Sequence, residues 1–270
     1  MLDLRVGLFR QFLVRLRVGT HVQNQEPDPF LPFLYGFDVR PDARNEGLEE
    51  VMLGWACAQA RAAEEGRGRR GSISISVPLK YPAIAAHRQP LLGRYGFAPA
   101  GASHFMVRSL HDPIPQPEFP TGFTFRPAAG EADIERQVEL FTRSQRYPWT
   151  IEQHRDALAD PDYRADLDLI GIAPDGQFVA YCKCDILQET CIQNGRRQGW
   201  VTELGTRPGF RDLWLERSML LASLHALQRA GIDDAVHREE MENIGSSLFD
   251  LYEALGFRVA DTTVFYRKEL

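Results

Sequence analysis

The segment around Arg211 combines the residue types and the spacing that an anion-binding site requires. A strand-like run, Trp200–Thr206, leads through a turn near Arg211 into a long amphipathic run, Asp212–Ala230. A helix that follows a strand so closely presents its first unpaired N–H groups and the positive end of its dipole to whatever lies in front of it. The sequence therefore predicts a site for a phosphorylated ligand at this junction.

Hydrophobic spacing predicts the elements that position this junction. Helical spacing covers Glu131–Arg143, and Thr150 is suited to cap a second helix that ends at Leu158. The remaining predicted elements are a short strand Thr124–Arg126, a hairpin of Leu167–Ala173 and Phe178–Ile186 around the turn Pro174-Asp175-Gly176, a short strand Ala235–His237, a helix Ile244–Leu255 and a final strand Thr262–Arg267. This order is of α/β (α+β) character, with one strand–helix–strand crossover at its centre.

An internal repeat divides the chain. Four groups of residues recur 167 positions later: Arg40-Pro41 as Arg207-Pro208, Arg44 as Arg211, Leu48-Glu49 as Leu215-Glu216 and Met52-Leu53 as Met219-Leu220. Three more recur after 160 positions: Leu91, Gly96 and Phe97 as Leu251, Gly256 and Phe257. We therefore expect two related domains, 1–110 and 123–270.

The segment 111–122, with its four prolines, is expected to be an extended linker between the two domains. The first copy has a shorter front than the second, because only Met1–Val39 precede its Arg-Pro pair, whereas Phe123–Thr206 precede the other. An incomplete first copy would leave a sheet edge to be covered by the second domain, by a partner subunit as in a homodimer, or by further sequence.

Composition excludes several classes of protein. A chain of 270 residues with 44% hydrophobic and 25% charged residues is typical of globular proteins, and a net charge of −6 opposes binding to nucleic acid. Arginines interrupt the apolar start, and no run is long enough to span a membrane, so we expect a cytoplasmic protein without a membrane partner. The four cysteines have no metal-ligand spacing, and Cys182 and Cys184 are expected in the core on one face of a strand.

Two stretches carry a more specific signal. Val201–Pro208 (VTELGTRP) with Arg211, and Asn243 with Leu251–Phe257 (LYEALGF), resemble the GNAT superfamily of acyl-CoA N-acyltransferases, and the whole chain resembles its tandem members. The resemblance covers about Phe123 to Leu270, with a weaker echo from Phe33 to Leu110. It implies a mixed central sheet flanked by helices, acetyl-CoA as co-substrate, and transfer of the acetyl group to the amine of a small molecule or peptide.

The resemblance also implies which residues would hold acetyl-CoA. Leu204, Gly205 and Thr206 would line the pantetheine arm where the strand separates from its neighbour, and Asn243 would contact the cofactor or cap the next helix. The pyrophosphate would be held by Arg211, Asp212, Leu213, Trp214, Leu215, Glu216 and Arg217. Two of these depart from the pattern, because Trp214 and Glu216 stand where the family has small residues. The first copy keeps Gly47 at the earlier of these positions but has Glu49 at the later one.

The implied reaction is direct attack of a neutral amine on the thioester, without a covalent enzyme intermediate. By resemblance, the Thr206 amide would face the oxyanion and Tyr252 would protonate the thiolate; the alternative for Tyr252 is packing in the core. The identity of the general base that deprotonates the amine stays open. Glu203 is expected on the surface, since strand alternation places it on the face opposite Trp200, where the family often has a glutamate. Asp185 and His154 are remote alternatives acting through water.

Two further expectations concern function. The first copy has Leu92 at the position of the tyrosine and should be catalytically inactive. The acceptor pocket, expected around Arg146–Arg155, carries no recognisable code, so aminoglycosides, amino acids, thiol-sugar amines and peptide N-termini stay open. The rival hypothesis is a silent binding or scaffold protein that has lost acyl-CoA, motivated by Trp214 and Glu216.

Overall fold

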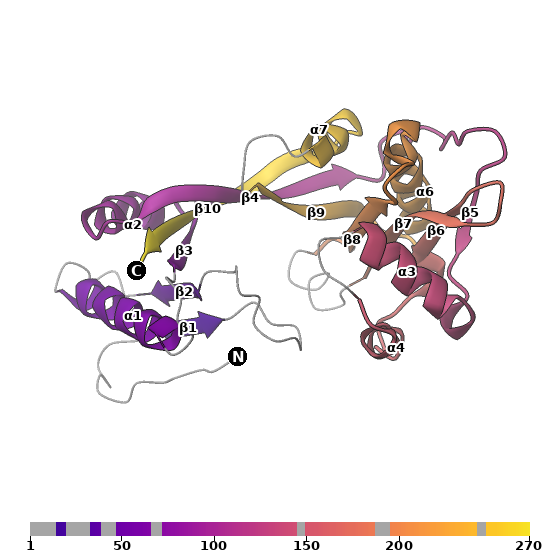
Figure 1. Ribbon diagram of the computed structural model, residues 1–270. Coiled ribbons are helices and arrows are strands. Elements are labelled where there is room, and N and C mark those ends of the chain that lie inside the picture. Colours follow the sequence, from indigo (N-terminus) through magenta and orange to yellow (C-terminus); the bar gives the residue numbers. More distant parts are fainter. Residues whose placement is uncertain are drawn as a thin grey trace. The chain divides into compact units, whose positions relative to one another are not determined.

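The computed structural model describes residues 15–19, 33–38, 47–65, 72–144, 149–186, 195–241 and 247–270. The chain forms two compact units (Figure 1). The first contains residues up to His104 together with the chain's end, Asp261–Leu270, and the second contains Phe105–Glu239 and Ser247–Ala260. Each unit has its own buried hydrophobic cluster.

In the first unit, the last strand of the chain completes the sheet. Strands β1 (Arg15–Gly19) and β2 (Phe33–Asp38) are antiparallel, and β2 runs parallel to β3 (Ser72–Pro78). Helix α1 (Leu48–Glu65) joins β2 to β3, and α2 (Pro82–Arg94) leads from β3 to β4 (Ala98–Ser109). Strand β10 (Arg258–Glu269) pairs antiparallel with β3 from Thr263 to Glu269. The sequence placed this strand in the second copy, but here it covers one edge of β3 and adds Tyr266 to the first unit's core.

The repeat predicted from the sequence recurs in the backbone. Helix α1 begins at Leu48 and helix α6 (Leu215–Arg229) begins at Leu215, the residues that the repeat aligns. The residues just before these helices, Gly47 and Trp214, both have positive φ, 81° and 58°. Gly96 and Gly256, which end α2 and α7 (Ser247–Ala254), also match, with φ of 77° and 87°. The two copies therefore share local conformation at these aligned turns.

The second unit is a sheet between helices. Its strands are β5 (Thr124–Pro127), β6 (Asp168–Ile172), β7 (Phe178–Asp185), β8 (Gln198–Thr206) and β9 (Asp234–Met241), in the spatial order β9-β8-β7-β6-β5. Strands β5 to β8 are antiparallel, and β8 runs parallel to β9 after the crossover through α6.

Alternate residues of β7 reach the two faces of this sheet. Cys182 and Cys184 pack in the cluster that contains α6, as predicted, whereas Tyr181 packs against Phe141 of α3 (Ile134–Ser144). Helix α4 (Ile151–Leu158) continues the α3 layer, and Thr150 caps it in a reciprocal capping box with Gln153. The predicted α/β architecture, with a mixed sheet flanked by helices, is confirmed.

Some boundaries differ from those expected. Helix α6 begins three residues after Asp212, because a short 3-10 turn, Arg211–Leu213, precedes it. Strand β9 extends to Met241, and α7 is described from Ser247. Asn243 and the Arg40–Arg44 part of the repeat lie outside the described residues.

The proline-rich segment 111–122 lies along α6. The Gln228 side chain donates from Nε2 to the Leu110 carbonyl at 2.7 Å, and the His225 Nε2 atom lies 3.1 Å from the Pro115 carbonyl oxygen. Ile114 and Phe119 pack against the core of the second unit. The segment is therefore docked onto the second unit, within which it lies.

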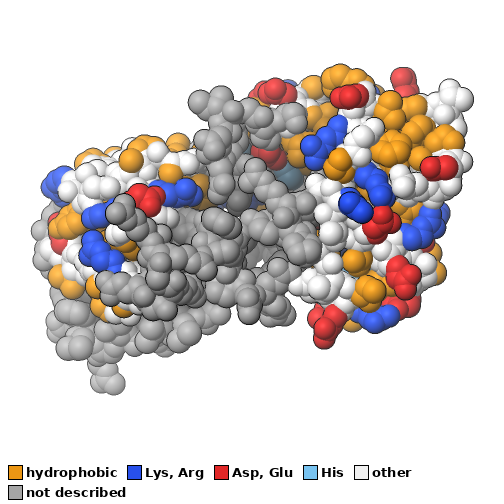
Figure 2. Space-filling model, in the orientation of Figure 1, with side chains coloured by type: hydrophobic (Ala, Val, Ile, Leu, Met, Phe, Trp, Pro, Cys, Tyr) orange, Lys and Arg blue, Asp and Glu red, His pale blue; other side chains and the backbone are white. Residues whose placement is uncertain are grey.

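The surface and the helices add two observations. On the face of the second unit seen in Figure 2, acidic and basic side chains are interspersed, so this face lacks the basic stripe typical of nucleic-acid binding. None of the helices in the described part of the chain is long and apolar enough to cross a membrane.

Candidate functional site

Strands β8 and β9 separate halfway along their length. Their parallel pairing runs from Gln198↔Asp234 to Trp200↔Val236 and is not continued by later residues of the described strands. Strand β8 nevertheless continues to Thr206, held by β7 along its other edge. A gap therefore opens between β8 and β9 beyond Trp200.

The backbone of β8 directs N–H groups into this gap. The Arg207 amide donates to the Val179 carbonyl at 2.8 Å, and the next pair along the ladder is Ala180↔Thr206. Because hydrogen-bonded and non-hydrogen-bonded pairs alternate in an antiparallel ladder, the N–H groups of Thr206 and Leu204 point away from β7 and toward β9. The gap thus has donors on one wall.

His237 holds the narrow end of the gap. Its Nδ1 atom lies 2.9 Å from the Val201 carbonyl oxygen, and its Nε2 atom lies 2.9 Å from the Glu239 carboxylate. The backbone pairing with β9 ends at Trp200, and the next carbonyl of β8, that of Val201, has the His237 side chain as its hydrogen-bond partner instead. Both ring nitrogens of His237 are therefore engaged, one by β8 and the other by Glu239 of its own strand.

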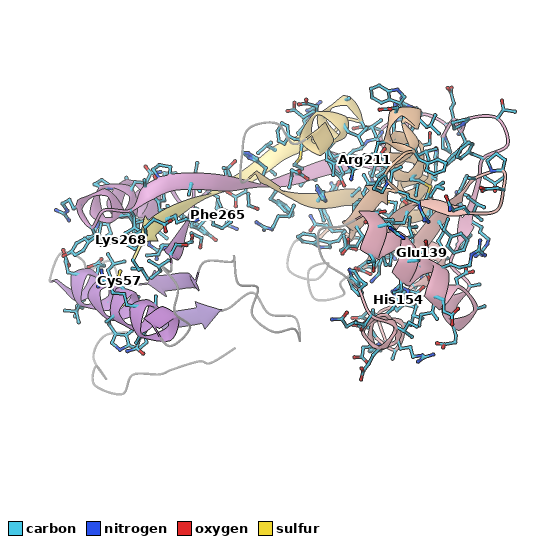
Figure 3. The ribbon with its side chains drawn as sticks, in the orientation of Figure 1. Cys57, Glu139, His154, Arg211, Phe265 and Lys268 are labelled. Carbon is cyan, nitrogen blue, oxygen red and sulfur yellow. The ribbon has the colours of Figure 1, made fainter. Side chains whose placement is uncertain are left out.

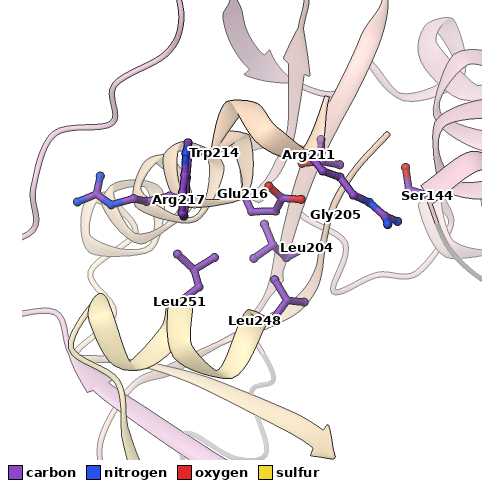
Figure 4. A pocket seen from close by; sticks show the side chains of 10 residues that line it. Ser144, Leu204, Gly205, Arg211, Trp214, Glu216, Arg217, Leu248 and Leu251 are labelled. Carbon is purple, nitrogen blue, oxygen red and sulfur yellow. The ribbon is translucent and has the colours of Figure 1, made fainter. Parts of the chain in front are cut away.

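A cavity of about 430 Å³ opens beside the gap, within the size range of ligand pockets. It is lined by Ser144, Leu204, Gly205, Thr206, Arg211, Trp214, Glu216, Arg217, Leu248 and Leu251. Figure 4 shows Arg211 extending toward Ser144, with Glu216 between Arg211 and Trp214. Seven of these lining residues belong to the cofactor set expected from the sequence, which the fold brings together from β8 and the start of α6.

The other members of that set lie elsewhere. Leu215 is buried in the core under α6, whereas Asp212 and Leu213 are exposed and do not line the cavity. Sequence reasoning missed Ser144, at the end of α3, and Leu248, on α7. Leu248 lies three residues before Leu251 on α7, the helix that carries most of the LYEALGF motif. Helical spacing from Leu251 could therefore have identified it.

Two hydroxyl groups at the cavity lack partners. Ser144 Oγ and Thr206 Oγ1 are buried and have no hydrogen-bond partner among the described residues, although both side chains belong to the cavity lining. Unpaired buried hydroxyls are uncommon because each costs roughly 1–3 kcal/mol. They provide hydrogen-bonding capacity for a polar ligand.

Gly205 is required by the close approach of Tyr181, its direct partner across the β7–β8 ladder. A Cβ atom at this position would lie 2.6 Å from the Tyr181 hydroxyl oxygen. Any side chain here would therefore displace a buried tyrosine or distort the strand that forms the cavity wall. The missing side chain of Gly205 therefore leaves room for Tyr181 beside the strand whose amides face the gap.

Trp214 does not close the cavity. Its side chain is 74% exposed, and its backbone has a left-handed conformation, φ 58°, which a bulky residue rarely adopts. No side chain caps the start of α6, so the first N–H groups of that helix are available to an anion. Glu216 adds a negative charge at this end of the helix, opposed by Arg211 and Arg217.

Tyr252 lies in the core next to the cavity and does not line it. Its exposed fraction is 0%, its ring stacks on His237 with centroids 4.0 Å apart, and its hydroxyl has no partner among the described residues. Burial raises the pKa of Tyr252 well above its usual value, so the phenol stays protonated. The surroundings of Tyr252 are thus those of a core residue, as the packing alternative expects. Packing does not explain why its hydroxyl has no partner among the described residues.

Glu203 does not lie opposite Trp200, contrary to expectation. The β7–β8 ladder pairs Lys183 with Glu203 and then Cys184 with Val201, so Thr202 is an extra, bulged residue. A bulge reverses the alternation of side chains beyond it. Glu203 therefore faces the α3 side of the sheet, as Trp200 does, and reasoning from alternation alone was wrong.

A second cavity of about 40 Å³ lies on that α3 face. Its lining consists of Phe141, Trp149, His154, Ala157, Leu158, Tyr163, Asp168, Lys183 and Glu203. Figure 3 labels a residue of each cavity, Arg211 ahead of α6 and His154 on α4. The two cavities share strand β8, because Glu203 lines the second and its neighbour Leu204 lines the first.

Comparisons with known proteins give related sequences and folds. No family model matches the chain. The chain is 26% identical over 251 residues to the mycothiol acetyltransferase of Segniliparus rotundus, covering 88% of this chain and 86% of that protein. A GCN5-related N-acetyltransferase from Sphaerobacter thermophilus superposes with a TM-score of 0.76 at 20% identity, over 95% of this chain and 76% of that one. A tandem GNAT protein from the clavulanic acid biosynthesis pathway gives a TM-score of 0.57 at 16% identity, over 87% and 75% of the two chains.

Proposed function

We propose, from the premise that this chain has the GNAT fold and a mycothiol acetyltransferase as its homologue, that it is an acetyl-CoA-dependent N-acetyltransferase. The single observation that carries the proposal is the gap between β8 and β9, which opens beside a cavity at the start of α6. The acceptor is the amine of a small molecule or a peptide. The second unit carries the chemistry, since the first has Leu92 where the second has Tyr252.

The residues at the first cavity fit acetyl-CoA. The first amides of α6, with Arg211 and Arg217, supply donors and positive charge for the pyrophosphate. The pantetheine arm, whose amides need donors and acceptors, would run along Leu204–Thr206, where β8 directs N–H groups into the gap. Ser144 Oγ and Thr206 Oγ1 are further polar partners.

The reaction proceeds by direct attack. The acceptor ammonium first loses one proton, and the neutral amine then forms a C–N bond to the thioester carbonyl while its oxygen, now negative, accepts a hydrogen bond from the Thr206 N–H. The C–S bond breaks, the thiolate takes a proton, and the nitrogen loses its second proton. The products are the amide, free coenzyme A and one proton released to solvent.

Tyr252 is the proton donor in this proposal. A donor must hold its proton until the thiolate forms, and the raised pKa of Tyr252 ensures that it does. Its unpaired hydroxyl needs only a ligand atom within reach to become satisfied. The proton that leaves the nitrogen last then restores the phenol.

The rival function is a silent GNAT-fold protein, favoured by the positions of Trp214 and Glu216. The carboxylate of Glu216 lies in the cavity lining, where it repels a pyrophosphate. Two arginines in the same lining oppose it, and the indole is turned outward. These observations favour a weakened acetyl-CoA site over an abolished one.

Calorimetry with acetyl-CoA tests the proposal. We expect a dissociation constant below the millimolar range, and a loss of about 10-fold for Arg211→Ala, since a charge-assisted hydrogen bond contributes about 1.5–3 kcal/mol. Arg229→Ala, at the exposed far end of α6, is the matched control and should bind as the wild type does.

Thiol release is then measured across a panel of amines that includes thiol-sugar amines, because the relative is named for mycothiol. Absence of heat at millimolar acetyl-CoA would sink the proposal. Binding without thiol release for any amine would favour the silent protein.

A further inference from the structure

A chain of buried hydrogen bonds lies behind the second cavity. Tyr163 donates its hydroxyl proton to Asp168 Oδ2 at 3.0 Å, and Gln137 donates from Nε2 to the same oxygen at 3.2 Å. The Gln137 Oε1 atom lies 3.2 Å from His154 Nε2. Because Gln137 uses its amide N–H toward Asp168, its oxygen faces the histidine, and His154 must donate through Nε2.

This network leaves two bare acceptors. With its proton on Nε2, neutral His154 presents a lone pair at Nδ1, and burial lowers the pKa of His154, which favours the neutral form. His154 Nδ1 and Asp168 Oδ1 are both buried and have no partner among the described residues. The two residues are 5% and 1% exposed, and both line the second cavity.

The remaining walls are suited to a cation. Phe141, Trp149 and Tyr163 contribute aromatic rings to the lining, and the Tyr163 ring already has a cation, the Lys183 ammonium, 5.8 Å from its centroid. Glu203 adds a carboxylate to the lining. The ammonium of Lys183 lies 3.7 Å from Asp185, so its charge is already partly compensated.

The occupant must supply donors and be small. An ammonium group carries three N–H donors and a positive charge, whereas an alcohol offers one donor and an anion none. The cavity of about 40 Å³ has room for a small group, since a single buried water needs roughly 10–15 Å³. That space accommodates the end of an unbranched aminoalkyl chain.

We propose that the second cavity binds the primary ammonium end of the acceptor, with Asp168 and His154 as its hydrogen-bond acceptors and Glu203 as the group that receives its proton. The inference rests on the proposed function and narrows its acceptor to amines with an unbranched CH₂–NH₃⁺ end.

The position of Glu203 connects this cavity to the first one. Glu203 and Leu204 are neighbours on the part of β8 that β9 no longer pairs, and they line different cavities. The proposal places the nitrogen of the second cavity and the acetyl group of the first on opposite faces of β8, beside the gap. Proton transfer from R–NH₃⁺ to the Glu203 carboxylate gives R–NH₂ and a carboxylic acid, and the amine then attacks.

The binding step is tested without acetyl-CoA, so that its outcome is separate from that of the transferase proposal. Ligand-detected saturation-transfer NMR compares n-butylammonium chloride with n-butanol on the full-length protein. We expect saturation transfer to n-butylammonium alone, and at least a 10-fold weaker dissociation constant for Asp168→Asn. Asp166→Asn, an exposed neighbour paired with Arg164, is the matched control and should leave binding unchanged.

Ala157→Leu is the second variant, because it fills the cavity without changing its charge, and it should also abolish binding. A thermal melt establishes that each variant is folded. Equal signals for n-butanol and n-butylammonium, no signal for either, or full binding by both folded cavity variants would each overturn the assignment. Where thiol release is detected, Glu203→Gln should lower kcat by 10-fold or more.

Discussion

At the residue scale, the Tyr252 hydroxyl costs stability because it is buried without a partner among the described residues, and it is also the proposed proton donor. A tyrosine that only packed the core would be expected to pair its hydroxyl, because an unsatisfied buried polar group costs roughly 1–3 kcal/mol. Here the ring is held between His237 and Phe257 while the hydroxyl has no partner in the described part of the chain. A catalytic role is one explanation for such an unsatisfied group.

Tyr252→Phe should therefore separate the two roles. We expect the free energy of unfolding to rise by about 1 kcal/mol, because the unpaired hydroxyl is removed without leaving a large void. We also expect thiol release to fall by roughly 100-fold or more while the dissociation constant of acetyl-CoA stays within about 2-fold. Urea denaturation, steady-state kinetics and calorimetry measure the three quantities. A parallel loss of affinity and rate would contradict the proton-donor role.

At the element scale, the turn between β8 and α6 determines how the anion site is formed. The 3-10 turn Arg211–Leu213 delays the helix so that it begins at Leu215, directly after Trp214 in the left-handed region. The aligned residue of the first copy, Gly47, adopts the same kind of conformation without a side chain. The left-handed turn is therefore common to both copies, and the tryptophan imposes strain on one of them.

Trp214→Gly should relieve this strain. Holding a bulky residue at φ 58° costs roughly 1–3 kcal/mol, and the greater flexibility of unfolded glycine offsets roughly 0.5–1 of that. We expect a net gain of about 1 kcal/mol in unfolding free energy and tighter acetyl-CoA binding, because the backbone can approach the pyrophosphate more closely. Trp214→Ala removes the indole but keeps the strain, so it is the control measured beside it. Unchanged affinity in both variants would place the pyrophosphate elsewhere.

At the scale of the whole molecule, the chain's last strand belongs to the first unit. Residues Thr263–Glu269 of β10 pair with β3, and Tyr266 is buried in the cluster that also contains Ile73 and Ile75. An unpaired β3 edge would be a template for aggregation. The first unit therefore depends on residues that follow the second unit in sequence.

Tyr266→Ala should show this dependence. We expect the free energy of unfolding to fall by about 3 kcal/mol, as for other large aromatic truncations in a core. Hydrogen exchange at the amides of β3 should accelerate, while exchange at β7 amides stays slow. Val259→Ala, at an exposed position earlier on the same strand, is the control. Equal acceleration in both strands would show instead that the two units unfold together.

The sequence by itself determined much of this protein. The 167-residue repeat, the α/β order, the capped helix after Thr150 and the lining of the first cavity by residues of β8 and the start of α6 were all predictable. The repeat, the element order and the cap are read from hydrophobic period, turn residues and spacing along the chain, whereas the residues of the first cavity were expected from the resemblance to the GNAT superfamily.

The tertiary structure alone decided the rest. The bulge at Thr202, which turns Glu203 toward the second cavity, depends on the pairing of β8 with β7. The membership of β10 in the first unit and the bare acceptors of Asp168 and His154 depend on partners distant in sequence. Register and hydrogen-bond satisfaction are properties of pairs of segments, so no periodicity within one segment encodes them.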